Sequence, residues 1–176
     1  EAQFQLGQLN EYNFDSSYNA VYWYRKAAEN GHAEAQYKMG ECYESGYGVG
    51  ESSSDAIDWY QKAAYQGNAY AIDWIISAAE NGGPELQYEL GILYECGNGV
   101  EQSYDTALYW YYKAVAQDYS SAYTSLEELA EEGNSQAQYY LGKCYEKGYS
   151  VYSDMSKAEE WYHKSADQGN ADAQNA

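Results

Sequence analysis

The chain has 176 residues, of which 28 are acidic and nine are basic, giving a formal net charge of −19. A surface of this charge repels phosphate backbones and anionic membranes, so nucleic acid is not expected as a partner. Leu, Ile, Val and Phe together number only 21, but 24 Tyr, five Trp and 24 Ala can fill helix interfaces by pairing large rings with small neighbours. No apolar run is long enough to span a bilayer.

The predicted elements belong to a repeat. A five-residue motif recurs at a spacing of 51 residues, as Q-Y-K-M-G at 36–40, Q-Y-E-L-G at 87–91 and Q-Y-Y-L-G at 138–142. A Trp-Tyr pair keeps the same register, at 59–60, 110–111 and 161–162. An earlier copy runs from Ala2 to Tyr24 and beyond with a loop three residues shorter. Recurrence over such blocks predicts an array of at least four copies.

Each copy predicts two helices joined by a glycine turn. Small and aromatic residues cover all but one narrow face of residues 33–44, which predicts a first helix packed between neighbours. Gly46 and Gly48 can adopt positive φ and so predict the turn that follows. The N-cap position of the second helix holds Ser52 and its equivalents Ser103 and Asp154. The tryptophans Trp59, Trp110 and Trp161 are expected at equivalent, mostly buried sites on that second helix.

Two segments lie outside the copies, residues 69–82 and 120–133, and each is one helix long. The first repeats the Ala-Ile-Asp-Trp of the preceding second helix, and the second keeps the apolar spacing without the Trp. An inserted single helix reverses the up-down order of the helices that follow it. Three-helix units with a local distortion of the array are therefore expected.

The predicted organisation is a single solenoid over residues 1–176. Its copies span about 1–32, 33–68, 83–119 and 134–169, with extra helices at 69–82 and 120–133 and the start of a further copy at 170–176. The sequence begins at Glu1, without Met and inside a repeat, which predicts that the natural protein continues beyond both ends.

The recurring residues carry a family resemblance. The pattern A-x-A-Q-Y-x-[LM]-G-x-x-Y-x-x-G-x-G-V, followed by A-x-x-W-Y-x-K-A-A-x-x-G-N, closely resembles the Sel-one-like repeat, or SLR, a relative of the tetratricopeptide repeat. The resemblance covers nearly the whole chain. It implies an all-α fold, an α/α right-handed superhelical solenoid, and a role as an adaptor for protein assemblies without chemistry of its own.

The sequence offers little for catalysis, and no catalytic residue, cofactor or metal is expected. His32 and His163 have no Cys or carboxylate at metal-ligand spacing, so both are interpreted as surface histidines. The glycine turns lack the Lys-Ser or Lys-Thr that follows a phosphate-binding loop. The many carboxylates fall on predicted polar faces, where nothing tunes them for acid and base catalysis.

The three cysteines, Cys42, Cys96 and Cys144, are odd in number and are predicted to be free thiols. Free thiols favour a reducing compartment such as the cytoplasm, while a secreted or periplasmic location stays open. Some SLR proteins are secreted, carry paired cysteines and have been credited with β-lactam binding or hydrolysis. This chain lacks those pairs, because Cys42 and Cys144 align with Leu93 in the middle copy.

A polar stripe on each first helix is the candidate partner-binding surface. Its residues in the last three copies are Glu34, Lys38, Glu41, Glu44; Glu85, Glu89, Ile92, Glu95; and Gln136, Tyr140, Lys143, Glu146. These positions are interpreted as varying between copies while the packing positions do not. Selection by a partner and simple tolerance by solvent both explain such variation.

The leading functional hypothesis is a non-enzymatic scaffold that binds a protein or peptide on the surface of the stacked first helices. The partner is expected to contact it through basic residues, because Lys113 is the only basic residue between 63 and 142. An alternative is a structural subunit that self-assembles end to end through uncapped repeat faces. A third, β-lactam binding or hydrolase-like activity, rests on the family resemblance alone.

Overall fold

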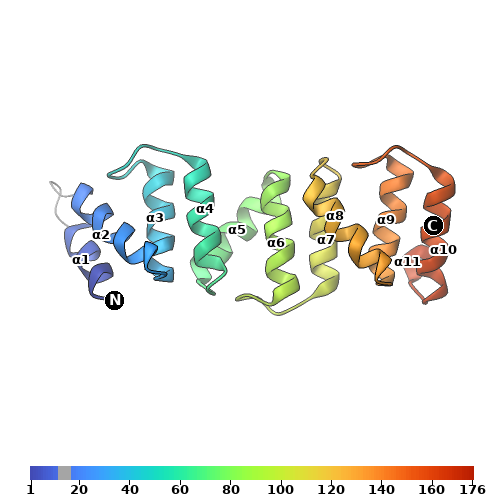
Figure 1. Cartoon of the computed structure of the whole chain (residues 1–176), viewed down its shortest axis with the longest axis horizontal. Helices are drawn as coiled ribbons and strands as arrows, with labels where there is room; N and C mark the ends of the chain where they lie inside the picture. The colour runs from blue at the N-terminus through green and yellow to red at the C-terminus, as the bar shows by residue number, and fades with distance from the viewer. Residues whose placement is uncertain (12–16) are drawn as a thin grey trace. The chain divides into compact units, whose positions relative to one another are not determined.

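The structure is a computed structural model and describes residues 1–11 and 17–176. Within those ranges every regular element is an α-helix, which confirms the all-α prediction (Figure 1). The helices are α1 (Ala2–Glu11), α2 (Ser17–Glu29), α3 (Ala33–Ser45), α4 (Ser53–Ala64), α5 (Ala69–Asn81), α6 (Pro84–Cys96), α7 (Tyr104–Val115), α8 (Ser120–Glu131), α9 (Ser135–Lys147), α10 (Met155–Asp167) and α11 (Ala171–Gln174). None of the described helices combines the length and the apolar character needed to cross a membrane.

The chain divides into two compact units. Unit 1 comprises residues 1–77 and 98–101, and unit 2 comprises residues 78–97 and 102–176. Helices α1 to α4 belong to unit 1, helices α6 to α11 belong to unit 2, and α5 crosses the boundary. The arrangement of both units in a single solenoid stays a prediction, as do the repeat boundaries drawn from the sequence.

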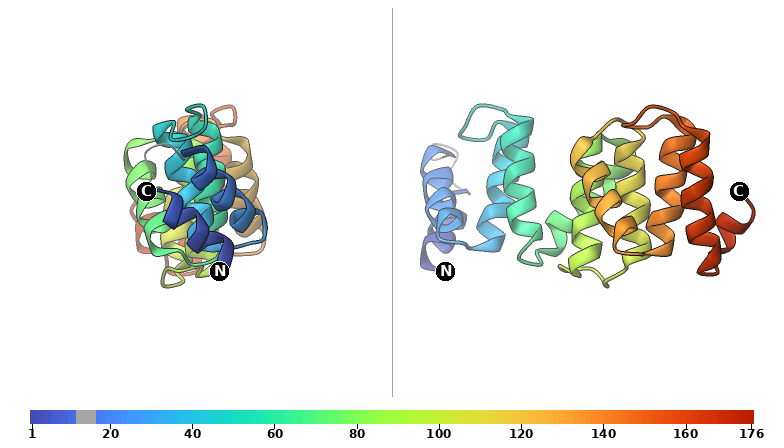
Figure 2. Two further views of the ribbon diagram at one scale, coloured as in Figure 1. Left: turned by 90° about the vertical axis from the view of Figure 1, so that its left-hand side faces the viewer. Right: turned by 45° about the vertical axis from the view of Figure 1, so that its right-hand side comes forward.

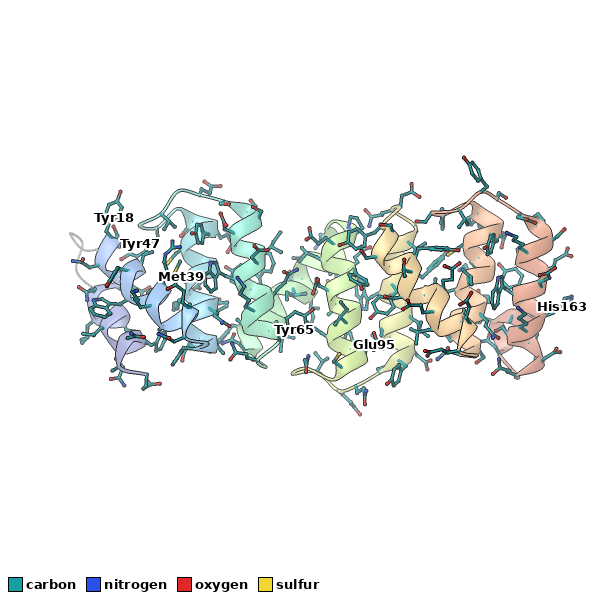
Figure 3. All side chains as sticks on the ribbon, viewed as in Figure 1. Tyr18, Met39, Tyr47, Tyr65, Glu95 and His163 are labelled. Carbon is teal, nitrogen blue, oxygen red and sulfur yellow. The ribbon has the colours of Figure 1, made fainter. Side chains whose placement is uncertain are left out.

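In unit 1, α1 packs on α2, α2 on α3, and α3 on α4. The core among the first three helices contains Phe4, Tyr24 and Met39 together with alanines from α2 and α3. Met39, labelled in Figure 3, has no exposed surface. Alanine at the contacts allows the helices to approach closely, and the large side chains fill the space that remains.

In unit 2, α6 packs on α7, α8 contacts both α7 and α9, and α9 lies antiparallel beside α10 (Figure 2). The turn after α6 lies at the bottom of Figure 1 and the turn after α9 at the top. The odd helix α8 stands between the two pairs, so the direction of the second pair is reversed. This is the reversal that the sequence predicts after an inserted helix.

A tyrosine of each second helix packs against a glycine of the first helix. The ring of Tyr60 lies so close to Gly40 that a Cβ atom added there would be 2.4 Å from it. The other pairs have the same arrangement, with added Cβ atoms at 2.4 to 2.7 Å: Gly7 with Tyr24, Gly91 with Tyr111, and Gly142 with Tyr162. Only glycine permits this approach, so the motif glycine is required by packing rather than by backbone conformation.

The tyrosine, and not the neighbouring tryptophan, is the main core residue of the pair. Tyr60 and Tyr111 are buried completely, while Trp59 and Trp161 are half-buried and Trp110 is 9% exposed. Trp59 and Trp161 pack against the edges of the core clusters, so the expected equivalent sites are occupied, with more exposure at Trp59 and Trp161 than at Trp110. Consecutive helix positions point about 100° apart, so only one of the two rings can face the first helix.

A buried glutamine on each of α3, α6 and α9 bonds both to the preceding helix and to a glutamine just after the following helix. The amide of Gln36 donates to the carbonyl of Ala28 in α2 at 3.1 Å, and its oxygen accepts from the amide of Gln66 after α4. Gln87 and Gln138 make the same two kinds of contact in unit 2. A buried amide without partners would be strongly destabilising, so these bonds help to fix the register between helices.

The turns confirm the caps that the sequence predicts. Gly46, Gly97 and Gly148 adopt φ of 70° to 75°, and each donates its N–H to a carbonyl of the preceding helix. The side chains of Ser52, Ser103 and Asp154 accept from backbone N–H groups in the first turns of α4, α7 and α10.

We expect Gly40→Ala to destabilise the chain by roughly 1–3 kcal/mol, because the added Cβ atom would displace the ring of Tyr60. Urea unfolding measures the difference. Gly50→Ala is the matched control, since an added Cβ atom at Gly50 meets nothing within 4 Å. Equal stability of the two variants would contradict the close approach of glycine and tyrosine.

Candidate functional site

The structure places the predicted stripe residues at different depths. Glu34, Glu44 and Glu85 are exposed. The other members are half-buried: Lys38, Glu41, Glu89, Ile92, Glu95, Gln136, Tyr140, Lys143 and Glu146. The stripe therefore combines solvent-facing acids with side chains that already have neighbours within the chain.

The last glutamate of the stripe accepts a hydrogen bond from the buried tyrosine. The hydroxyl of Tyr60 donates to Glu44 at 2.8 Å, and the indole N–H of Trp74 donates to the other oxygen of that carboxylate at 3.1 Å. The equivalent bonds are Tyr24 to Glu11, Tyr111 to Glu95 and Tyr162 to Glu146. Burial, and then the adjacent carboxylate, raise the pKa of each tyrosine well above its usual range.

This finding changes the interpretation of the stripe. The stripe positions were expected to vary between copies, yet the last position is Glu at Glu44, Glu95 and Glu146, and the equivalent residue of the first copy is Glu11. Its carboxylate holds the hydroxyl of a core tyrosine, which is a structural role. Glu95, labelled in Figure 3, is one of these residues.

In unit 1, Lys38 forms an ion pair within the stripe. Its Nζ atom lies 2.8 Å from Glu41 and 3.9 Å from Glu11 of α1. Two depressions adjoin these residues, one of about 550 Å³ beside Gln5, Gln8 and Leu9 and one of about 400 Å³ beside Glu41 and Glu44. Glu11 and Lys38 line both of them.

In unit 2, the stripe of α9 is occupied by aromatic contacts. The ring of Tyr140 stacks on Tyr112 with a centroid distance of 4.9 Å and an interplanar angle of 18°. The Nζ atom of Lys143 lies 4.8 Å from the ring centre of Tyr112, 5.3 Å from that of Tyr139 and 6.0 Å from that of Tyr140. The ammonium group therefore has three tyrosine rings as neighbours, a favourable setting for a cation.

Every basic side chain has a partner within the chain, and all nine basic residues lie in the described ranges. Each lies over an aromatic ring or pairs with a carboxylate. The cation–ring pairs are Arg25 with Tyr43, Lys26 with Tyr22, Lys62 with Trp59, Lys113 with Trp110, Lys143 with Tyr112, Lys157 with Tyr145 and Lys164 with Trp161. The ion pairs are Lys38 with Glu41 and Lys147 with Glu146. The many acidic groups on the surface greatly outnumber these partnered cations.

A further depression of about 840 Å³ in unit 2 is lined by two residues that the sequence analysis missed, Asp118 and Ser150. They adopt φ of 62° and 55°, in the left-handed region that favours glycine. Their equivalents in other copies are indeed glycines, Gly67 for Asp118 and Gly48 for Ser150. The Asp118 carboxylate accepts from the backbone N–H of Ser150 at 3.0 Å, which links the two residues. The absence of glycine at positions 118 and 150, where other copies have it, is the feature of the sequence that could have pointed to these two residues.

The histidines and cysteines do not form a site. The Nδ1 atom of His32 accepts from the backbone N–H of Ala35 and caps α3, and its ring stacks on Phe4. His163 is exposed on α10 (Figure 3). Cys42 and Cys144 are buried and Cys96 is exposed. No three metal-binding side chains gather anywhere in the part of the chain that the structure describes.

These features define a helical-repeat protein whose helix pairs are built on a shared set of glycine, tyrosine, glutamate and glutamine contacts. The sequence model of the Sel1 repeat family matches residues 1–32, 33–68, 84–119 and 135–170. The chain therefore belongs to the Sel1 repeat family, as the resemblance to SLR proteins implied. Proteins of this family generally mediate protein–protein interactions and are typically not catalytic.

Individual relatives share part of the sequence. Chitin synthase regulatory factor 3 of Schizosaccharomyces pombe is 33% identical over 131 residues, which cover 61% of this chain and 14% of that protein. Among solved structures, a Sel1 repeat protein from Oxalobacter formigenes is 30% identical, with 99% of this chain and 75% of that chain covered and a TM-score of 0.37. A protective antigen of uropathogenic Escherichia coli with an SLR fold is also 30% identical, with 98% and 47% covered and a TM-score of 0.36.

We expect Glu95→Ala to destabilise the chain by roughly 1–3 kcal/mol, because the buried hydroxyl of Tyr111 would lose its charged acceptor. Glu85→Ala, an exposed position in the first turn of the same helix, should change the stability by less than about 0.5 kcal/mol. Thermal or urea unfolding of the two variants makes the comparison. Similar losses in both would argue against a structural role for the last glutamate.

We also expect the stability to fall as the pH rises into the alkaline range. Burial raises the pKa of the Cys42 and Cys144 thiols to about 12, and it raises the pKa of the core tyrosines Tyr60 and Tyr111 as well. In the unfolded chain thiols ionise near pH ~8.5 and tyrosines near pH ~10, so unfolding releases protons between those values and the higher folded pKa values. The urea midpoint measured at pH 8, 9, 10 and 11 should decrease throughout. A midpoint that rises across this range would contradict the burial of these groups.

Proposed function

We propose that this chain is a non-enzymatic interaction module that binds a protein or peptide partner on the solvent faces of its first helices. Membership of the Sel1 repeat family supports the proposal, because such proteins generally mediate protein–protein interactions. The net charge of −19 argues against nucleic acid as the partner. The partner carries basic residues at its contacts.

The observation that carries the choice of a basic partner is the internal pairing of all nine basic side chains. Cations that already lie over rings or beside carboxylates are less available to attract an acidic partner. The first helices meanwhile present acids to solvent, Glu34 on α3 and Glu85 on α6. Residues 63–142 contain twelve acidic residues and one basic residue, Lys113, which lies over Trp110. The charge that such a surface offers a partner is negative.

The variation within the stripe supports binding on this face. The packing contacts recur from copy to copy, whereas the second stripe position holds Lys38, Glu89 and Tyr140 in successive copies. Folding is supported by the recurring contacts, so the differences between copies are free to serve recognition. The last stripe position is left out of the proposed surface because its glutamate holds the core tyrosine.

The test uses the whole chain and a pair of peptides of about 15 residues, one rich in Lys and Arg and one of the same length rich in Asp and Glu. We expect only the basic peptide to bind, with an association rate that falls between about 0.05 M and 0.5 M salt as charges are screened. Glu85→Gln with Glu89→Gln should weaken binding by roughly fivefold to tenfold. Surface plasmon resonance measures both effects.

Glu128→Gln with Glu131→Gln is the matched control, since it removes the same charge from exposed positions of α8 in the same unit. This pair should lower the affinity by less than about twofold. Equal losses from the two pairs, or association that does not respond to salt, would show that the acids serve solubility and that recognition lies elsewhere.

A further inference from the structure

Three aromatic side chains of unit 1 form a partly exposed group beside the polar stripe of α3. The ring centre of Tyr37 lies 5.6 Å from that of Tyr70 and 5.5 Å from that of the buried Tyr60, and the rings of Trp74 and Tyr60 are 4.3 Å apart. Tyr70 is 68% exposed, while Tyr37 and Trp74 are half-buried. Tyr70 and Trp74 come from the part of α5 that belongs to unit 1. We call Tyr37, Tyr70 and Trp74 the aromatic platform.

Carboxylates flank the aromatic platform. Glu34 and Glu41 lie about one helical turn before and after Tyr37 on the same face of α3. Burial raises the pKa of Tyr37, and the nearby carboxylate of Glu41 raises it further. Glu44 accepts from the indole N–H of Trp74 at 3.1 Å and fixes the orientation of that ring. The faces of these rings therefore lie in a negative field.

Among the described residues, which include all nine basic ones, no cation lies over the rings of the aromatic platform. Each basic side chain lies over another ring or beside a carboxylate. Lys38 is the only basic residue of α3, and it pairs with Glu41. It therefore offsets one of the three neighbouring carboxylates and leaves a net negative charge around the platform.

The sequence of α5 explains why Trp74 has no such cation. On α4, α7 and α10 a lysine follows the tryptophan by three residues, and its Nζ atom lies 3.7 to 5.1 Å from the ring centre of that tryptophan. Helix α5 repeats the Ala-Ile-Asp-Trp of α4 but has Ser77 in place of the lysine. Its tryptophan therefore keeps a ring face that a cation occupies on the other helices.

The equivalent tyrosine of α9 already has a cation beside it. The ammonium group of Lys143 lies 5.3 Å from the ring centre of Tyr139, which is the equivalent of Tyr37. Helix α3 has Glu41 at the position of Lys143. A carboxylate at this position attracts a cation from outside the chain to the ring, because the chain itself supplies none there.

A guanidinium group fits the aromatic platform better than an ammonium group. It is flat, so it stacks on an aromatic face while its N–H groups donate to carboxylates at the edge. Arg25 of this chain combines a ring contact with a hydrogen bond. Its guanidinium carbon lies 5.7 Å from the ring centre of Tyr43, and its Nη2 atom donates to the Tyr43 hydroxyl at 2.9 Å. An ammonium group is compact and strongly hydrated, so it gains less from an open ring face.

We propose that the aromatic platform binds an arginine side chain of the partner protein. The guanidinium group lies over the exposed faces of Tyr70 and Trp74, and Glu34 and Glu41 accept its N–H groups. Glu44 is a positioning residue, which acts through the indole of Trp74. Tyrosine, tryptophan and arginine are the residues that contribute most at protein interfaces. The inference rests on the proposed function, since it names one residue type of the basic partner and the place where it binds.

The experiment uses the full chain and three fluorescein-labelled peptides, measured by fluorescence anisotropy. The peptides are identical except that the same positions hold arginine, lysine or the uncharged arginine analogue citrulline. We expect the arginine peptide to bind about threefold more tightly than the lysine peptide and at least about tenfold more tightly than the citrulline peptide. Tyr70→Ser with Trp74→Ser should weaken the binding of the arginine peptide at least about fivefold and abolish the preference for arginine over lysine.

The serine variant should fold as the parent does, because unit 2 has Ser121 and Ser125 at the positions equivalent to Tyr70 and Trp74. Circular dichroism checks this. Tyr104→Ser is the matched control, since it removes another exposed tyrosine, 49% exposed on α7, and should leave the affinities unchanged.

Unchanged binding of the arginine peptide by the Tyr70 and Trp74 variant would overturn this inference, as would a lysine peptide that binds the parent as tightly as the arginine peptide. The proposed function would survive either result if Glu85→Gln with Glu89→Gln still weakened binding. No binding of either cationic peptide would overturn both.

Discussion

The close approach of a tyrosine ring to a glycine is the contact on which each helix pair depends. Any side chain at Gly7, Gly40, Gly91 or Gly142 would occupy the space of the ring, and any smaller residue in place of the tyrosine would leave a cavity. The ring also brings a hydroxyl into the interior, where a glutamate from the end of the first helix accepts its hydrogen bond. Packing and polar satisfaction are thus combined in three residues per copy.

This arrangement limits which surface positions are available for recognition. The last glutamate of each polar stripe accepts a hydrogen bond from the tyrosine of its own helix pair. The interior glutamines donate to a carbonyl of the preceding helix. What remains on the first helices is a smaller set of side chains, of which Glu34 and Glu85 face solvent. A solenoid protein can diversify these positions without disturbing its core, because each repeat contacts only its neighbours.

The distribution of charge on the surface also depends on contacts within the chain. On the second helices, aromatic residues pack into the core on one face and lie next to lysine ammonium groups on another. Lys62 lies over the ring of Trp59, and Lys164 lies over the ring of Trp161. A chain with few cations that keeps all of them over rings or beside carboxylates leaves a surface dominated by acids. Such a surface favours solubility, and it also speeds association with a basic partner.

The sequence by itself determined the repeat spacing, the helical class and the helix caps, because these depend on local pattern and turn chemistry. It did not distinguish Trp59 from Tyr60 as the core residue, since adjacent apolar positions look equivalent until the neighbouring helix is placed. It grouped Glu95 with Glu85, although only the first meets a buried hydroxyl. The tertiary structure decided this difference, because the partners of a side chain depend on which helix packs against its face and not on the residue type alone.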